Sequence, residues 1–146
     1  MIILGLGSNL GNSHAYLERA IDLISKDLLN SVQRSNIYES PPMLPENAPE
    51  EWNRGFLNMA ISGKLVKEVS PEEFLVKIKE IEKKLGRKES PRWAPREIDI
   101  DILAWDDLEL ITENLQIPHP GLTERAFAII PFAELAPDWT HPRSGI

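Results

Sequence analysis

The chain has 146 residues, enough for one ordinary domain and too few for two. Its 42% hydrophobic and 27% charged content is typical of a folded globular protein, and the absence of cysteine excludes a disulfide framework or a thiolate zinc site. The net charge of −7 opposes binding to nucleic acid or to an acidic membrane, and the short apolar runs exclude a membrane-spanning helix.

The first predicted elements are a strand, a helix and a second strand. Met1–Leu6 is short and apolar, as in a buried strand. Residues 13–29 place aliphatic side chains at helical spacing, with Asn12 or Ser13 as the N-terminal cap. Val32–Ser40 is strand-like, so the chain begins with the order β-α-β.

A long loop and a further strand follow. Pro41-Pro42 cannot continue a sheet ladder, and residues 43–55 are rich in proline and asparagine. A loop of about 13 residues is long for a compact domain, and such loops are often functional. Phe56–Val66 alternates between apolar and small or polar residues, which predicts a strand.

The next segment has the clearest helix signals in the chain. Ser70 provides an N-terminal cap, Pro71 occupies the first helical position, and Glu73 stands three residues after the cap. Apolar residues keep the helical period to Leu85, and Gly86 stands where a left-handed C-terminal cap belongs. We therefore expect a helix that ends at Gly86.

The rest of the chain contains a second loop, at residues 86–96, and a strictly alternating strand, Glu97–Trp105. Asp106-Asp107 is expected to turn the chain into Leu108–Ile111, which predicts a hairpin. A short helical run begins at about Thr123.

The order β-α-β-β-α-β predicts an α+β fold with a ferredoxin-like βαββαβ core. The hairpin and the two long loops are additions to this core. One domain is expected to span residues 1–146.

Acidic residues alternate with isoleucine in the last predicted strand. Because alternate residues share a face, Ile100 points to the core and Asp99 and Asp101 point away from it, with α-carbons about 6.5–7 Å apart. Two like charges on one face repel, so the pair is either a solvated strand face or a cation site. Mg²⁺ suits such a pair because it takes carboxylate oxygens and keeps phosphate and water as its other ligands.

The loop before this strand is basic, with Arg87, Lys88, Arg92 and Arg96 around Trp93. Alone, it could be a solvated loop. Beside two carboxylates, it matches a phosphoryl-transfer site, in which a metal bridges phosphate oxygens and guanidinium groups neutralise the charge of the transition state.

Two further features have a structural explanation as well as a functional one. Gly5-x-Gly7-Ser8-Asn9-x-Gly11 follows a strand and precedes a helix, but its spacing is neither that of a dinucleotide loop nor that of a P-loop. A close-approach turn is therefore expected rather than an anion-binding nest. His119 lies between two prolines and is either structural or, with Arg125, a phosphate contact.

Taken together, these motifs resemble 6-hydroxymethyl-7,8-dihydropterin pyrophosphokinases of folate biosynthesis over essentially the whole chain. The motifs that carry the resemblance, in chain order, are Gly5-Leu6-Gly7-Ser8-Asn9-Leu10-Gly11, Tyr38-x-Ser40-Pro41-Pro42, Phe56-Leu57-Asn58, Gly86-Arg87, Arg92-Trp93-x-Pro95-Arg96-x-Ile98-Asp99-x-Asp101 and Pro118-His119-Pro120…Arg125-x-Phe127.

The resemblance implies transfer of pyrophosphate from ATP to the hydroxymethyl group of the pterin, giving AMP and the pterin diphosphate. It also implies two Mg²⁺ ions that bridge the ATP phosphates and are held by Asp99 and Asp101. The catalytic residues would then be these two aspartates together with Arg87 and Arg96, which would stabilise the transferring group.

The resemblance further implies two substrate subsites. The ATP-binding residues would be Leu75, Lys79, Glu82, Lys88, Trp93, Arg96, Ile102, His119 and Arg125. The pterin-binding residues would be Ser40, Pro41, Pro42, Met43, Phe56, Asn58, Trp93, Asp99 and Phe127.

The expected partners are ATP and the hydroxymethyl-dihydropterin, without nucleic acid or membrane. A cytoplasmic location is expected, because residues 1–5 lack the basic region of a secretory signal. A monomer is expected as well. The chain could also be fused or adjacent to another folate-pathway enzyme. Two other hypotheses are a small-molecule-binding regulatory module on the same scaffold and a metal-dependent phosphohydrolase.

Overall fold

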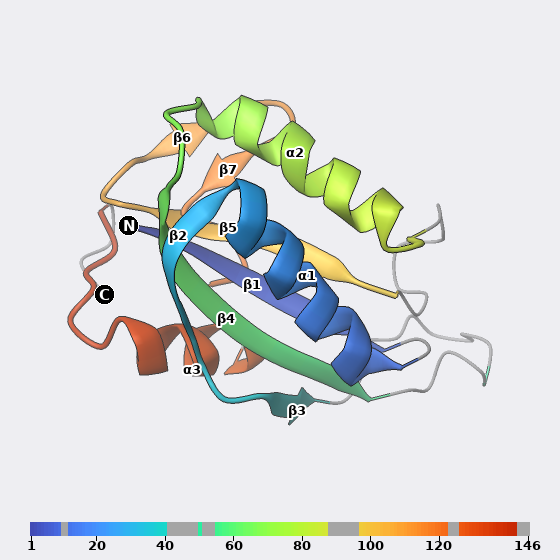
Figure 1. Ribbon diagram of the computed structural model, residues 1–146. Helices are drawn as coiled ribbons and strands as arrows, with labels where there is room; N and C mark the ends of the chain where they lie inside the picture. Colours follow the sequence, from blue (N-terminus) through green and yellow to red (C-terminus); the bar gives the residue numbers. More distant parts are fainter. Residues whose placement is uncertain (10–11, 41–49, 51–54, 88–96, 123–125, 143–146) are drawn as a thin grey trace.

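A computed structural model describes residues 1–9, 12–40, 50, 55–87, 97–122 and 126–142 of the chain. Its centre is an antiparallel sheet with the strand order β2-β4-β1-β5, and a short strand, β3, pairs with β4 along the same edge as β2 (Figure 1). The strands of this sheet are β1 (Ile2–Ser8), β2 (Leu29–Arg34), β3 (Tyr38–Ser40), β4 (Phe56–Leu65) and β5 (Asp99–Trp105).

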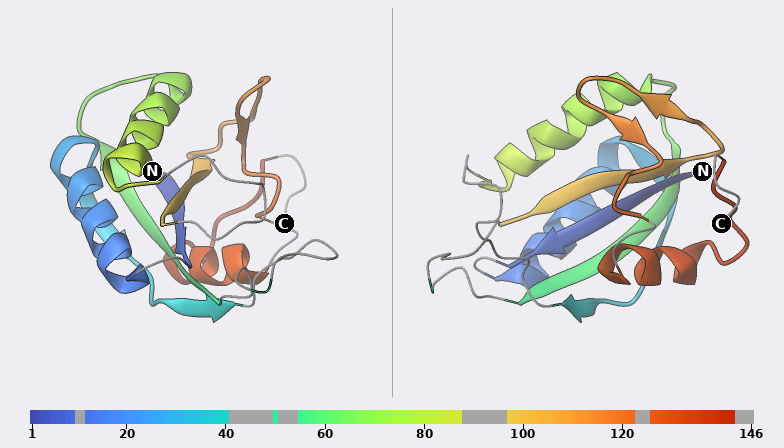
Figure 2. Two further views of the ribbon diagram at one scale, coloured as in Figure 1. Left: turned by 90° about the vertical axis from the view of Figure 1, so that its right-hand side faces the viewer. Right: turned by 180° about the vertical axis from the view of Figure 1, so that it is seen from behind.

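Helices cover both faces of the sheet. Helices α1 (Ser13–Asp27) and α2 (Pro71–Lys84) pack on one face, and α3 (Ala126–Leu135) lies on the other (Figures 1 and 2). The protein is thus a mixed α/β structure built on an antiparallel sheet, with three α-helices in its described part. None of the helices in that part is long and apolar enough to cross a membrane.

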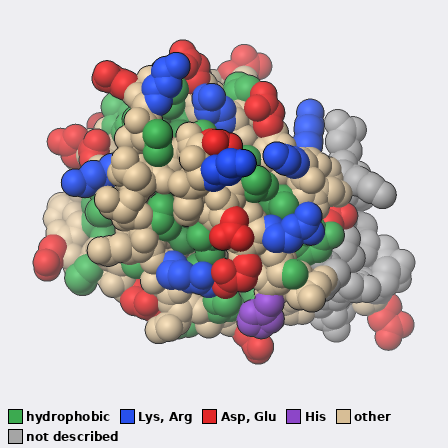
Figure 3. Space-filling view, in the orientation of Figure 1, with side chains coloured by type: hydrophobic (Ala, Val, Ile, Leu, Met, Phe, Trp, Pro, Cys, Tyr) green, Lys and Arg blue, Asp and Glu red, His purple; other side chains and the backbone are tan. Residues whose placement is uncertain are grey.

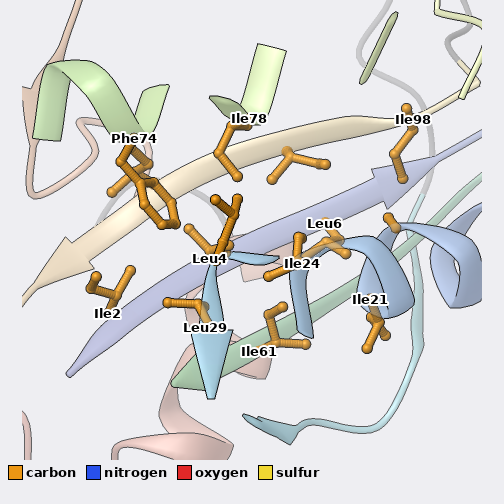
Figure 4. Packing of buried hydrophobic residues seen from close by; sticks show 14 of the residues in the cluster. Ile2, Leu4, Leu6, Ile21, Ile24, Leu29, Ile61, Phe74, Ile78 and Ile98 are labelled. Carbon is orange, nitrogen blue, oxygen red and sulfur yellow. The ribbon is translucent and has the colours of Figure 1, made fainter. Parts of the chain in front are cut away.

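The main core lies between the sheet and the first two helices. Leu4 and Leu6 of β1, Ile24 of α1, and Phe74 and Ile78 of α2 meet there with exposed fractions of 2% or less (Figure 4). Burying one such side chain contributes roughly 1.5–3 kcal/mol. A second, smaller core under α3 contains Ile3, Ala60, Leu103, Ala104, Leu122 and Phe132. The sheet is therefore buried on both faces over much of its area.

The single strand predicted over Val32–Ser40 is interrupted in the structure. Residues 35–37 separate β2 from β3, and both strands pair with β4. Ser35 keeps the edge satisfied at the break, because its N–H donates to the carbonyl of Ala60 and its hydroxyl accepts from the N–H of Ala60, each at 2.9 Å. Because the hydroxyl of Ser35 takes the place of a backbone acceptor, the alternation of apolar and polar residues in the sequence does not reveal the break.

The predicted hairpin with Leu108–Ile111 is wrong. Strand β6 (Leu110–Ile111) pairs instead with β7 (Gln116–Ile117) in a separate two-stranded sheet. The turn itself forms, because the N–H of Leu108 donates to the carbonyl of Trp105 at 2.9 Å and Asp106 has a positive φ of 50°. The residues after it lie in the separate sheet instead of pairing with β5.

Helix α2 begins and ends as its sequence predicts. The Ser70 side chain accepts from the N–H of Glu73 at 3.2 Å. At the other end, Gly86 adopts φ +101°, its N–H donates to the carbonyl of Lys83, and the N–H of Arg87 donates to the carbonyl of Glu82, each at 3.0 Å. These two bonds form a Schellman motif, which fixes the direction in which the chain leaves the helix.

Replacing Gly86 by alanine should lower the free energy of unfolding by about 1 kcal/mol, because an L residue is strained in the left-handed region. A clash is not the cause, since nothing lies within 4 Å of the added Cβ. Urea denaturation measures the loss. Gly86→Asn, which tolerates this backbone better, should lose less. An alanine variant as stable as the wild type would contradict the assigned cap.

Candidate active site

The two predicted carboxylates lie on the face of β5 that points away from the main core. Ile100 between them is fully buried, whereas the side chains of Asp99 and Asp101 are 25% and 40% exposed. Asp99 pairs across the sheet with Gly7 of β1, and Gly7 pairs with Asn58 of β4. Asn58, Gly7 and Asp99 therefore form one row across three strands, which places a buried amide and a carboxylate on opposite sides of a glycine.

Gly5 and Gly7 of the glycine-rich motif lie inside β1, so the turn expected there is wrong, while residues 10 and 11 of the motif lie outside the described residues. A Cβ on Gly7 would stand 3.3 Å from Oδ1 of Asn58, and one on Gly5 would stand 3.1 Å from the side chain of Leu103. The missing Cβ atoms thus make room for neighbouring side chains. Ser8, which follows, donates to the carbonyl of Glu97 at 2.5 Å and holds the chain that enters β5.

Glu82 is the centre of the polar contacts at this end of the sheet. Its side chain is 3% exposed. Oε2 accepts from Nη1 of Arg87 at 2.6 Å and from the N–H of Ile100 at 2.8 Å, and Oε1 pairs with Nζ of Lys79 at 3.1 Å. A buried charge is tolerated only when it is paired in this way. Glu82 therefore connects α2, the chain after it and the outer edge of β5.

Arg87 links this buried carboxylate to the exposed one. The same Nη1 that contacts Glu82 donates to Oδ1 of Asp99 at 3.0 Å. Burial of the guanidinium opposes its charge, but the nearby Glu82 and Asp99 outweigh that cost, so the pKa of Arg87 lies above its usual value. The site thus contains a permanently charged guanidinium within contact of a carboxylate that faces solvent.

His119 stands near the second carboxylate. Its Nε2 lies 3.9 Å from Oδ1 of Asp101, and its Nδ1 accepts from the N–H of Gly121 at 3.0 Å. Because Nδ1 acts as an acceptor, the proton of the neutral ring is assigned to Nε2, the atom that faces Asp101. The backbone N–H of His119 also donates to the carbonyl of Leu103, which ties this segment to β5.

The structure thus brings together Arg87, Asp99, Asp101 and His119, which belong to separate motifs of the sequence, and Glu82, which only the family resemblance implied. The sequence did not show that Glu82 joins α2 to the edge of β5. A signal was present, because this glutamate stands four residues after buried Ile78, in the apolar stripe of the helix.

The other predicted residues are placed as follows. Lys79 and half-buried Leu75 lie on α2, while half-buried Phe56 and buried Asn58 lie on β4. Ile102 is 3% exposed and packs in the main core. The predicted residues outside the described part of the structure are Pro41, Pro42, Met43, Lys88, Trp93, Arg96 and Arg125, together with the side chains of Ser40 and Phe127.

Comparison with known proteins points to one family. Residues 3–137 match the family model of 7,8-dihydro-6-hydroxymethylpterin-pyrophosphokinase (HPPK). The chain is 40% identical over 141 residues to the 2-amino-4-hydroxy-6-hydroxymethyldihydropteridine pyrophosphokinase of Aquifex aeolicus, a match that covers 97% of this chain and 83% of that protein.

Longer proteins match as well. The chain is 40% identical over 138 residues to the folate synthesis bifunctional protein of Chlamydia muridarum, a match that covers 93% of this chain and 30% of that protein. The crystal structure of Plasmodium falciparum HPPK-DHPS superposes with a TM-score of 0.65 at 17% identity, covering 96% of this chain and 41% of that one. This second likeness concerns the fold alone. The chain spans less than half the length of these two relatives.

Replacing Glu82 by glutamine should lower the free energy of unfolding by about 2 kcal/mol, the scale of a hydrogen-bonded charge removed from a buried site. Arg87 would keep its burial and lose its main counter-charge. Urea denaturation tests this, with exposed Glu80→Gln on the same helix as the control, expected to change stability by about 0.5 kcal/mol or less. Equal effects in the two variants would show that the contacts of Glu82 do not stabilise the fold.

Proposed function

The chain belongs to the 7,8-dihydro-6-hydroxymethylpterin-pyrophosphokinase family, and from this membership we propose that it transfers pyrophosphate from ATP to 6-hydroxymethyl-7,8-dihydropterin. The products are AMP and the pterin diphosphate, and the reaction serves folate biosynthesis. The observation that carries the proposal is the contact of Arg87 with Asp99, which lies next to Asp101 on one face of β5. From Asp99 the row across the sheet leads through Gly7 to Asn58.

In this proposal Asp99 and Asp101 hold Mg²⁺, and we propose two ions. The donor set fits, because two partly exposed carboxylates on one strand face offer the oxygen ligands that Mg²⁺ prefers. Among the described residues no group of three or more His, Cys, Asp or Glu could hold a metal. Mg²⁺ is usually bound by one or two carboxylates together with substrate phosphates. When bound, it would neutralise the phosphate oxygens of ATP.

The transfer requires attack by the pterin hydroxymethyl oxygen on the β-phosphorus of ATP. The bond from that phosphorus to the oxygen bridging to the α-phosphorus breaks, AMP leaves with the bridging oxygen, and the hydroxyl proton is lost. Negative charge grows on the transferred group and on the leaving oxygen, and Arg87 is placed to stabilise it. Both ion pairs of Arg87 use Nη1, and a guanidinium has five N–H donors, so it can contact phosphate while tied to Glu82.

The pterin would lie toward β4. An asparagine side chain offers both a donor and an acceptor, which suits the amide-like edge of a pterin ring. Asn58 is 7% exposed. Its Oδ1 lies next to Gly7, the residue that separates Asn58 from Asp99 in the row across the sheet. In this arrangement the ring meets Asn58 and Phe56, and the hydroxymethyl group extends across Gly7 toward the carboxylates.

Three finer points complete the proposal. We take β1-α1-β2-β4-α2-β5 as a ferredoxin-like core, supported by the strand order and by the shared face of α1 and α2. The partners are the two substrates, without nucleic acid; acidic and basic side chains intermingle on the face that carries α1 and α2 (Figure 3), which does not favour nucleic acid there. The chain works as a monomer in the cytoplasm, either alone or joined to another folate enzyme, as in the bifunctional relatives.

Product analysis tests the reaction. With ATP, Mg²⁺ and 6-hydroxymethyl-7,8-dihydropterin, chromatography should show one AMP for each pterin diphosphate formed. ADP as the nucleotide product would refute pyrophosphate transfer. Free phosphate without pterin would instead indicate a phosphohydrolase, and binding without turnover would indicate a regulatory module.

Metal binding can be tested separately from turnover. Asp101→Asn should weaken Mg²⁺-dependent binding of a non-hydrolysable ATP analogue by roughly tenfold or more in calorimetry, because one ligand oxygen loses its charge. Asp101 is preferred to Asp99 because Asp99 also holds Arg87. Exposed Asp107→Asn serves as the control and should bind like the wild type. Unchanged metal-dependent binding in Asp101→Asn would exclude this aspartate as a ligand.

A further inference from the structure

Strand β3 is held weakly for a strand beside a substrate site. It has only three residues, and it pairs with β4 through Tyr38 with Asn58, Glu39 with Leu57, and Ser40 with Phe56. These partners include the two described residues that the proposed function assigns to the pterin, Phe56 and Asn58. The position of β3 therefore decides the shape of one side of that subsite. Three residue pairs at a sheet edge fix such a position poorly.

A carboxylate from α3 provides the additional support. Oε2 of Glu134 accepts from the backbone N–H of Asn36 at 2.9 Å. Oε1 accepts from Nδ2 of Asn36 at 3.4 Å and from the hydroxyl of Tyr38. The acceptor and its donors lie almost a hundred residues apart in the sequence, but α3 and β3 lie close together in Figures 1 and 2. Glu134 thus holds both the chain entering β3 and its first side chain.

The electrostatics show that these groups keep their roles near neutral pH. The hydrogen bond to Glu134 raises the pKa of Tyr38, and the bonds from Tyr38 and from the N–H of Asn36 lower the pKa of Glu134. The phenol therefore remains a donor and the carboxylate remains charged. Both side chains are solvent-accessible, so the contact contributes little to folding, as exposed charged contacts generally do.

We propose that Glu134 is a positioning residue for the pterin: by holding Asn36 and Tyr38, it fixes β3 against the end of β4 that carries Phe56 and Asn58. This inference rests on the proposed function. It assigns the role to a residue of α3 that makes no contact with the reacting groups in this scheme. If Glu134 only stabilised the docking of α3, its replacement would lower the affinity for both substrates equally.

The test compares Glu134→Ala, Glu134→Gln and Tyr38→Phe with the wild type. Pterin affinity, measured by calorimetry in the presence of Mg²⁺ and an ATP analogue, should fall roughly fivefold in Glu134→Ala, the upper end of what an exposed charged contact contributes. It should fall less in Glu134→Gln, which keeps an acceptor oxygen. Affinity for the ATP analogue alone and the melting temperature should stay at the wild-type values. The double variant Tyr38→Phe/Glu134→Ala should lose no more than Glu134→Ala, because the two residues act through one contact.

A matched control and a spectroscopic readout complete the experiment. Glu18→Ala removes an exposed carboxylate that holds Arg34 at 2.6 Å on the neighbouring strand β2, and it should leave pterin affinity unchanged. The chain has two tyrosines, so Tyr16→Phe leaves Tyr38 as the only phenol for absorbance titration. In that background Glu134→Gln should return the pKa of Tyr38 toward its ordinary value.

The outcomes separate the two proposals. If the wild type binds pterin and forms AMP while the Glu134 variants bind pterin normally, or lose both substrates equally, the positioning role is refuted and the function stands. A pterin loss in Glu18→Ala as large as in Glu134→Ala would also refute it. If the wild type neither binds pterin nor forms AMP, the proposed function fails and the inference with it.

Discussion

The polar end of the sheet depends on the need to neutralise one buried carboxylate. Glu82 sits in the apolar stripe of α2, where an unpaired charge would be highly unfavourable. Its oxygens are satisfied by a backbone N–H of β5, by Arg87 and by Lys79. The first contact fixes the helix on the strand, and the second fixes the direction of Arg87. Through Arg87 the same charge reaches Asp99, so the geometry of the candidate metal site follows from the packing of a helix.

Local rules in the sequence predicted the elements in which neighbouring residues decide the structure. The caps of α2, the left-handed Gly86 and the alternation of β5 all depend on residues close together in the chain. The first two are confirmed, and the alternation is confirmed over Asp99–Ile102. The hairpin after Asp106 was wrong because Leu110–Ile111 pairs with Gln116–Ile117, a partner that the residues at the turn do not specify. The glycines of β1 were also misjudged, because the side chains they accommodate come from β4 and β5.

The same division applies to the candidate site. Alternation along β5 was enough to place Asp99 and Asp101 on one face. The contact of Glu82 with Ile100 joins residues on different elements, and that of Glu134 with Tyr38 joins residues far apart in the chain, so neither follows from spacing. The net charge of −7 was equally uninformative about nucleotide binding. In the structure, part of that negative charge lies on a few carboxylates that each contact a cation or a hydrogen-bond donor. The net charge of the chain does not show this local arrangement.

The contact between Glu82 and the N–H of Ile100 has one more consequence. Strand β5 is the last strand of its sheet, and the outer edge of such a strand can pair with another copy of the protein. The carboxylate of Glu82 accepts the hydrogen bond of the Ile100 N–H in the first half of this edge. A strand that added to the edge would have to displace this charge. The residue that orders the candidate active site therefore also occupies part of the edge at which a further strand could add.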